Sequence, residues 1–223
     1  LMDPEYPFVL GNIVEDKLIN CDWNGLDENL NDLKNKIFEG KEIASPMLSS
    51  TLFDSSELIY NASKIWNQQF EISNNQFDTL IVKKNTKINI GYFSADFRDH
   101  PVGHLIAKML ETHNKSKYEI FGFYLGNSHK ENDRFHRRIK NSFSNFYDVS
   151  DMSNEEIISL SKNLKIHIGI DLMAHTGGHE SRFGIFLNKL APVQINFLGY
   201  PGTSASDKID YIIADKTVIP EKN

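Results

Sequence analysis

The sequence predicts an α/β fold in which a mainly parallel β-sheet, covered by helices, follows a helical segment. Residues 1–75 carry apolar side chains at helical spacing, whereas from residue 87 onward short apolar runs alternate with helical segments. Strands that alternate with helices are typical of a parallel sheet, because each crossover between parallel strands places a helix on one of its faces. A polar stretch without clear periodicity, residues 76–86, separates the two patterns and is interpreted as a linker.

The N-terminal segment is predicted to contain two amphipathic helices. Their apolar residues recur at intervals of three and four: Leu26, Leu30, Leu33 and Ile37, then Leu58, Ala62, Ile65 and Trp66. This spacing places an apolar stripe on one side of each helix. Pro46 separates the two patterns, and Ser55 is suited to the start of the second helix. Trp23 and Trp66 are most simply core residues.

The remaining chain, residues 87–223, is predicted to contain five strands and at least three helices. The strands are expected at Ile88–Ser94, Tyr118–Leu125, Ile166–Leu172, Gln194–Leu198 and Tyr211–Ala214. The helices are expected at His104–His113, Asp133–Lys140 and Asn154–Leu164. The segment Asp133–Arg138 is basic, and we interpret it as a solvated helix face.

Composition and charge exclude several classes of protein. The chain has 223 residues, 40% of them apolar and 24% charged, which is close to the average for folded globular proteins. Its net charge of −6 gives no electrostatic attraction to nucleic acid or anionic lipid. No apolar run reaches the ~20 residues of a membrane span, and the acidic N-terminus is unlike a signal peptide.

Two further features bear on location and completeness. The single cysteine, Cys21, cannot form an intramolecular disulfide, which fits a reducing compartment and predicts a cytoplasmic protein. The chain begins with Leu1 rather than Met and stops soon after a strand-like run. We therefore expect the sequence to be a fragment.

Polar and glycine-rich segments follow three of the predicted strands. They are residues 94–104, 174–178 and 199–204. Ligands of open parallel sheets bind beyond the carboxyl ends of the strands, so we expect these loops to converge on one rim that forms the binding site.

Within the first loop, His100 is the candidate with acid–base chemistry. It directly precedes Pro101, a residue that favours the first turn of a helix, so its ring is expected near free backbone N–H groups. Imidazole transfers protons near neutral pH. The alternative is that His100 only caps or packs the turn. His104 lies four residues further on, but a metal site at that spacing needs a third ligand and the sequence supplies none.

The segment Gly199–Thr203 combines two glycines with a proline and predicts a tight turn that a ligand can approach closely. An ordinary turn is the alternative interpretation. No Gly-x-Gly-x-x-Gly or Walker-type loop follows the first strand of the sheet, which argues against a nicotinamide dehydrogenase or a P-loop enzyme.

Taken in order, these motifs resemble the catalytic region of the O-linked N-acetylglucosamine transferase family, including its SPINDLY-like and bacterial members. The matching blocks are Ile90–His104, Asp171–Thr176, Arg182 with Ile185–Phe186, Ala191–Ser204 and Asp210–Asp215. Upstream, Cys21-Asp22-Trp23 and the following helices resemble the segment that joins the family's tetratricopeptide array to the enzyme.

The resemblance implies an inverting glycosyltransferase of the GT-B type, with two facing Rossmann-like lobes. It implies UDP-N-acetylglucosamine as donor, protein serine or threonine hydroxyls as acceptors, and no metal or other cofactor. The family's active-site histidine maps to His100. The cleft residues implied by the matching motifs are Asp96, Pro101, Thr176, Gly199, Tyr200, Pro201, Gly202 and Thr203. This chain would be the helical adaptor and the first lobe, and the second lobe, which holds most of the nucleotide sugar, would be missing.

Two departures and two alternatives accompany the resemblance. Many relatives have Gly-Tyr-Thr in place of Ala174-His175-Thr176, and a glycine often stands in place of Ala205. SPINDLY-like relatives share these motifs but transfer fucose, so the sugar stays open. A protein-interaction scaffold that retains an inactive lobe is the alternative from another class.

Overall fold

The computed structural model describes residues 6–70, 86–126, 133–177 and 181–220. These residues fall into two compact units. The helical unit contains residues 1–71 together with 175–180 and 202–206, and the sheet unit contains residues 72–174, 181–201 and 207–223. The predicted linker, residues 76–86, lies outside the described residues except for its last residue.

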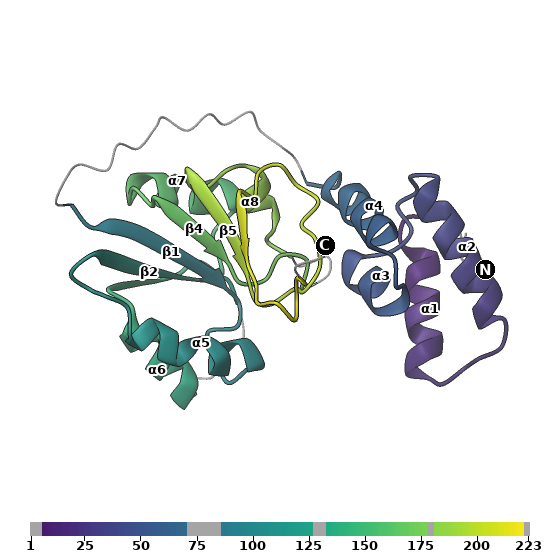
Figure 1. The fold of residues 1–223 in the computed structure, drawn as a ribbon, viewed down its shortest axis with the longest axis horizontal. Helices are drawn as coiled ribbons and strands as arrows, with labels where there is room; N and C mark the ends of the chain where they lie inside the picture. The colour runs from purple at the N-terminus through teal and green to yellow at the C-terminus, as the bar shows by residue number, and fades with distance from the viewer. Residues whose placement is uncertain (1–5, 71–85, 127–132, 178–180, 221–223) are drawn as a thin grey trace. The chain divides into compact units, whose positions relative to one another are not determined.

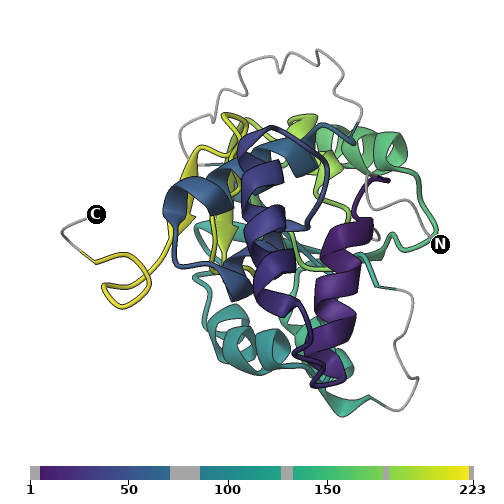
Figure 2. The ribbon, with the colours of Figure 1, turned by 90° about the vertical axis from the view of Figure 1, so that its right-hand side faces the viewer.

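The described residues of the helical unit form four helices around an apolar core. They are α1 (Val9–Ile19), α2 (Leu26–Phe38), α3 (Pro46–Leu52) and α4 (Ser56–Asn67). Figures 1 and 2 show α1 and α2 side by side. The buried side chains of Leu33, Ile37 and Leu58 belong to one apolar cluster, as their spacing predicts. The helical interpretation of this segment therefore holds, with α1 and α3 added to the two expected helices.

Serine side chains define the starts of two of these helices. The Ser55 hydroxyl accepts a hydrogen bond from the Leu58 amide at 3.3 Å, which confirms the predicted start of α4. Pro46 does more than separate two helices, because it is the first residue of α3, which Ser45 caps. The core assignment is confirmed for Trp66, which is 1% exposed, and wrong for Trp23, which is 64% exposed. Trp23 lies in the segment between α1 and α2, with most of its side chain exposed.

The sheet unit confirms the predicted α/β class. Its strands are β1 (Ile88–Ser94), β2 (Tyr118–Tyr124), β3 (Asn145–Asp148), β4 (Ile168–Asp171), β5 (Val193–Phe197) and β6 (Tyr211–Ile213). Its helices are α5 (Pro101–Glu111), α6 (Arg134–Ser142), α7 (Asn154–Asn163) and α8 (Gly184–Leu187). The strands pair in the order β3-β2-β1-β4-β5-β6 and every pair is parallel, the order found in Rossmann folds.

Both faces of this sheet are buried. Figure 1 shows α5 and α6 on one face and α7 and α8 on the other. Successive β1 residues point to opposite faces of the sheet. Tyr92 joins the apolar cluster formed with α5 and α6. On the other face, Phe93 stacks on Phe123, with 4.3 Å between ring centroids, and meets Phe186 of α8 edge-on. Within the described residues, no helix combines the length and apolar character needed to cross a lipid bilayer.

Candidate functional site

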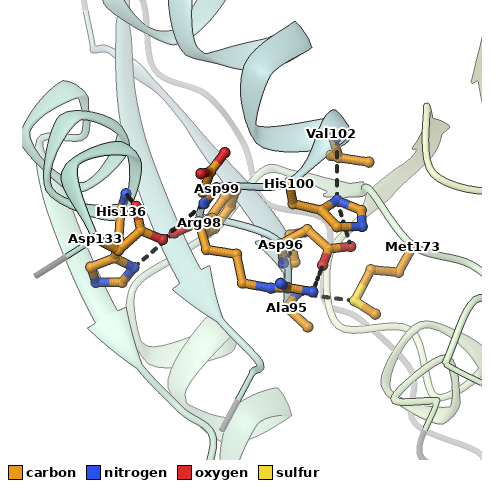
Figure 3. A network of polar contacts seen from close by, with 11 residues as sticks. Ala95, Asp96, Arg98, Asp99, His100, Val102, Asp133, His136 and Met173 are labelled. Atoms are coloured by element: carbon orange, nitrogen blue, oxygen red, sulfur yellow. Dashed lines mark hydrogen bonds and ion pairs between the residues drawn. The ribbon is translucent and has the colours of Figure 1, made fainter. Parts of the chain in front are cut away.

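The candidate site lies where the strand order of the sheet reverses. The chain runs from β1 outward through β2 and β3, then returns to the other side of β1 and continues through β4, β5 and β6. In open α/β sheets this reversal is where ligands bind, outside the carboxyl ends of the strands. The loops that leave β1 and β4 are in contact here, because the Ala95 amide donates a hydrogen bond to the Met173 sulfur at 3.0 Å (Figure 3).

His100 is the residue that caps α5. Its Nδ1 accepts a hydrogen bond from the Val102 amide at 3.3 Å, and Pro101 occupies the first helical position. The capping role considered as an alternative is therefore real, and it fixes the ring. The side chain of His100 is still 31% exposed. Capping and contact with a ligand are compatible, because the cap uses only one of the two ring nitrogens.

Asp96 lies beside this imidazole. Its Oδ2 is 3.6 Å from His100 Nδ1, and its Oδ1 accepts a hydrogen bond from the Arg98 guanidinium at 3.1 Å (Figure 3). The structure thus brings together Asp96, His100 and Pro101. Arg98, which was not among the predicted site residues, orients the carboxylate.

This geometry allows His100 two protonation patterns. While the Val102 amide donates to Nδ1, a neutral ring carries its proton on Nε2 and presents a hydrogen-bond donor. A proton on Nδ1 would face Asp96 Oδ2 instead, and Nε2 would then be free to accept a proton. A carboxylate beside a ring nitrogen of a histidine is a recurring arrangement in acid–base catalysis.

The end of β4 contributes a buried carboxylate. Asp171 Oδ1 accepts hydrogen bonds from the Met173 and Ala174 amides at 2.9 and 3.0 Å, and Oδ2 accepts one from the Asn196 side chain at 2.9 Å. Burial raises the pKa of Asp171 to about 6, although these three hydrogen bonds favour the charged form. Asp171 therefore shapes the segment after β4 and ties it to β5.

The turn after β5 packs against that same segment. Leu198 and Gly199 have φ of 57° and 67°, and a Cβ on Gly199 would overlap the Leu172 carbonyl. Only glycine fits this approach. The loops after β1, β4 and β5 are therefore consecutive neighbours, as expected from the sequence. Tyr200 is 4% exposed, whereas Pro201 is exposed.

A cavity of about 530 Å³ opens beside this turn. Its lining is mostly apolar and comes from residues 196–201, residues 212–215 and Val218. Gly199, Tyr200 and Pro201 all contribute to it, so these three predicted cleft residues border open space.

The other predicted cleft residues, Thr176, Gly202 and Thr203, belong to segments that group with the helical unit. The Thr203 hydroxyl accepts a hydrogen bond from the Ala205 amide at 3.1 Å. The carbonyl of Ser204 receives a hydrogen bond from the Asn67 side chain at 2.9 Å and lies 3.4 Å from His175 Nε2. Burial lowers the pKa of His175 to about 4. A role in binding for these residues stays a prediction.

Comparison with known proteins gives the family. Residues 63–223 match the domain described as glycosyl transferase family 41. The chain belongs to this family.

Several named transferases are similar to this chain. The chain is 37% identical over 134 residues to the probable UDP-N-acetylglucosamine–peptide N-acetylglucosaminyltransferase SEC of Arabidopsis thaliana, covering 60% of this chain and 13% of the relative. It is 33% identical over 144 residues to the corresponding transferase of Caenorhabditis elegans, covering 64% and 12%. An O-GlcNAc transferase mutant of Thermobaculum terrenum superposes with a TM-score of 0.68 at 21% identity, covering 86% of this chain and 38% of that one. The chain thus spans about an eighth of these two curated relatives.

The two alanines named as departures in the sequence share a backbone conformation. Ala174 and Ala205 have φ of 48° and 47°, in the left-handed region that favours glycine. Each alanine therefore holds its turn at some cost in backbone strain.

Proposed function

We propose that this chain contributes the first catalytic lobe of a protein O-GlcNAc transferase. In this proposal residues 1–75 are an adaptor that follows a tetratricopeptide array, 76–86 are a linker and 87–223 are the lobe. The second lobe of a GT-B enzyme holds most of the UDP-N-acetylglucosamine. The reaction transfers N-acetylglucosamine with inversion to a serine or threonine hydroxyl of a cytoplasmic protein and requires no metal or other cofactor.

The observation that carries this proposal is the position of His100. The imidazole is fixed at the start of α5, beside Asp96, at the point where the strand order reverses. Inverting transfer needs a proton removed from the acceptor hydroxyl and negative charge stabilised on the departing diphosphate. With Nε2 protonated, His100 is a donor toward the sugar or the diphosphate. With Nδ1 protonated toward Asp96, it is a base toward the hydroxyl.

The likeness to named transferases supports the proposal without deciding the sugar. The SEC relative of Arabidopsis, the Caenorhabditis relative and the SPINDLY relative of Arabidopsis match at 37%, 33% and 27% identity, and all three are named as UDP-N-acetylglucosamine–peptide N-acetylglucosaminyltransferases. A scaffold would need neither an accessible imidazole nor a carboxylate aligned beside it.

The test is sugar transfer by the full-length protein to an acceptor protein from the same cell, with UDP-N-acetylglucosamine and GDP-fucose compared at equal concentration. Mass spectrometry of the acceptor distinguishes the two sugars. We expect addition of N-acetylhexosamine to serine or threonine. Fucose on the acceptor would overturn the assigned donor, and no transfer from either donor would support the scaffold.

A further inference from the structure

The N-terminal end of α6 lies against the loop that carries His100. Asp133 caps α6, because its Oδ1 accepts hydrogen bonds from the Phe135 and His136 amides at 2.7 and 3.1 Å. Its second oxygen, Oδ2, accepts a hydrogen bond from the Asp99 amide at 2.8 Å (Figure 3). One carboxylate thus joins the helix to the residue that directly precedes His100.

His136, on the first turn of α6, makes a second connection to the same loop. Its Nδ1 is 2.7 Å from the carbonyl oxygen of Phe97. A carbonyl only accepts hydrogen bonds, so Nδ1 carries the proton and donates. The sequence predicts a solvated basic face for Asp133–Arg138, and for His136 that interpretation is wrong. His136 is 8% exposed, and its ring meets Tyr124 and Phe146 edge-on at 5.2 and 5.5 Å between centroids.

The two connections hold the backbone on either side of Arg98. Phe97 is itself fully buried, with its ring 5.2 Å from that of Phe143. With the Phe97 carbonyl and the Asp99 amide both held by α6, the chain has little freedom to rotate before it reaches His100. The direction of the imidazole then depends on α6 as well as on its own cap.

We propose that His136, assisted by Asp133, is a positioning residue that aims the His100 imidazole through the Phe97 carbonyl. The effect on catalysis rests on the proposed function. The clamp, by which we mean the two hydrogen bonds from Asp133 and His136 that hold the loop before His100, is a separate claim. His136 is buried beneath the loop and acts through its backbone.

Three variants separate the hydrogen bond from the packing. His136→Phe keeps a ring between Tyr124 and Phe146 and removes the donor. His136→Asn returns an amide N–H near the position of Nδ1, whereas His136→Gln carries its amide one bond further out. Ser161→Ala is the matched control, because Ser161 is fully buried and donates to the Leu190 carbonyl at 3.0 Å, a bond between segments that carry no predicted site residue.

The first measurement is hydrogen–deuterium exchange of the full-length protein over residues 95–104, which needs no substrate. Loss of one buried hydrogen bond is expected to speed exchange there roughly 10- to 100-fold in His136→Phe. His136→Asn and Ser161→Ala should exchange like wild type. Unchanged exchange in His136→Phe would overturn the inference. If His136→Phe does not fold, the other two variants decide. The inference requires faster exchange in His136→Gln and wild-type exchange in His136→Asn, and equal exchange in the two would overturn it.

The second measurement is the transfer rate of His136→Phe with and without His100→Ala. If His136 acts through His100, it lowers kcat in the wild-type background and has no further effect once His100 is absent. Equal losses in both backgrounds would show a general structural role and overturn the inference. Faster exchange in a protein with no transfer activity would overturn the proposed function and leave the clamp intact.

Discussion

Replacing Gly103 with alanine tests whether α5 and the His100 loop fit as closely as the structure shows. Gly103 is the third residue of α5, and helix propensity alone favours alanine there by about 1 kcal/mol. A Cβ at this position, however, would overlap the Arg98 carbonyl oxygen and lie 3.0 Å from the Asp96 carbonyl oxygen. Both neighbours are backbone atoms of the loop, so relief requires the loop itself to move.

The two effects have opposite signs, and the structure predicts which is larger. Overpacking against rigid neighbours costs about 1–3 kcal/mol, so Gly103→Ala should be destabilised by up to about 2 kcal/mol after the propensity gain. For a domain of this size each kcal/mol lowers Tm by roughly 2–4 °C. A displacement of the loop by ~1 Å should also reduce kcat by roughly 100-fold.

Thermal unfolding and transfer kinetics of the full-length variant measure both effects. Leu105→Ala is the matched control, because Leu105 lies on the same helix and is 68% exposed. The free energy of unfolding of this variant should change by less than about 0.5 kcal/mol. A rise in Tm for Gly103→Ala with unchanged kcat would refute the reasoning, because helix propensity alone would then account for the result.

Three other predictions concern the turns, the buried carboxylate and the nucleotide. Ala205→Gly should stabilise the protein by about 0.5–1 kcal/mol, because φ of 47° strains alanine and the residue is only partly buried; an unchanged denaturant midpoint would contradict this. The folded-state pKa of Asp171, about 6, lies above its ordinary value of 3.8, so the folded state binds this proton more tightly and stability falls as pH rises from about 4 to 6, by up to about 3 kcal/mol. Asp171→Asn should remove that slope, and a slope unchanged in the variant would show that another group causes it. Residues 1–223 alone should show no heat of UDP binding in calorimetry, and micromolar binding would place the donor site in this lobe.

The strands were predictable because each is a short apolar, β-branched or aromatic run bounded by polar residues. All five expected strands are present within a few residues of their predicted ends. The missed strand, β3, has four residues and lies at the edge of the sheet, where half of its sequence is polar. The one-turn helix α8 is too short to show a period. Helix α5 begins at Pro101 rather than His104, because the His100 cap and the proline start it one turn earlier.

The candidate site was predictable at the level of loops but not of contacts. His100 and the Gly199 turn stood out by residue type and position after a strand. The inward position of His136 was hidden by its basic neighbours, although its spacing of three from the buried Ile139 places both on one helix face. The Asp96–Arg98 pair and the bonds around Asp171 depend on loop conformations that side-chain periodicity does not encode.

The most direct test of the central claim is the transfer rate of the full-length protein with His100→Ala and His100→Gln. If the imidazole at the start of α5 orients the sugar or moves a proton, kcat should fall roughly 10²- to 10⁴-fold in both variants, the range of positioned acid–base groups. Their free energies of unfolding, measured by denaturant titration, should fall only by the loss of one helix cap, about 1 kcal/mol. Near wild-type turnover in both variants would remove His100 from the active site and contradict the proposed role of this rim.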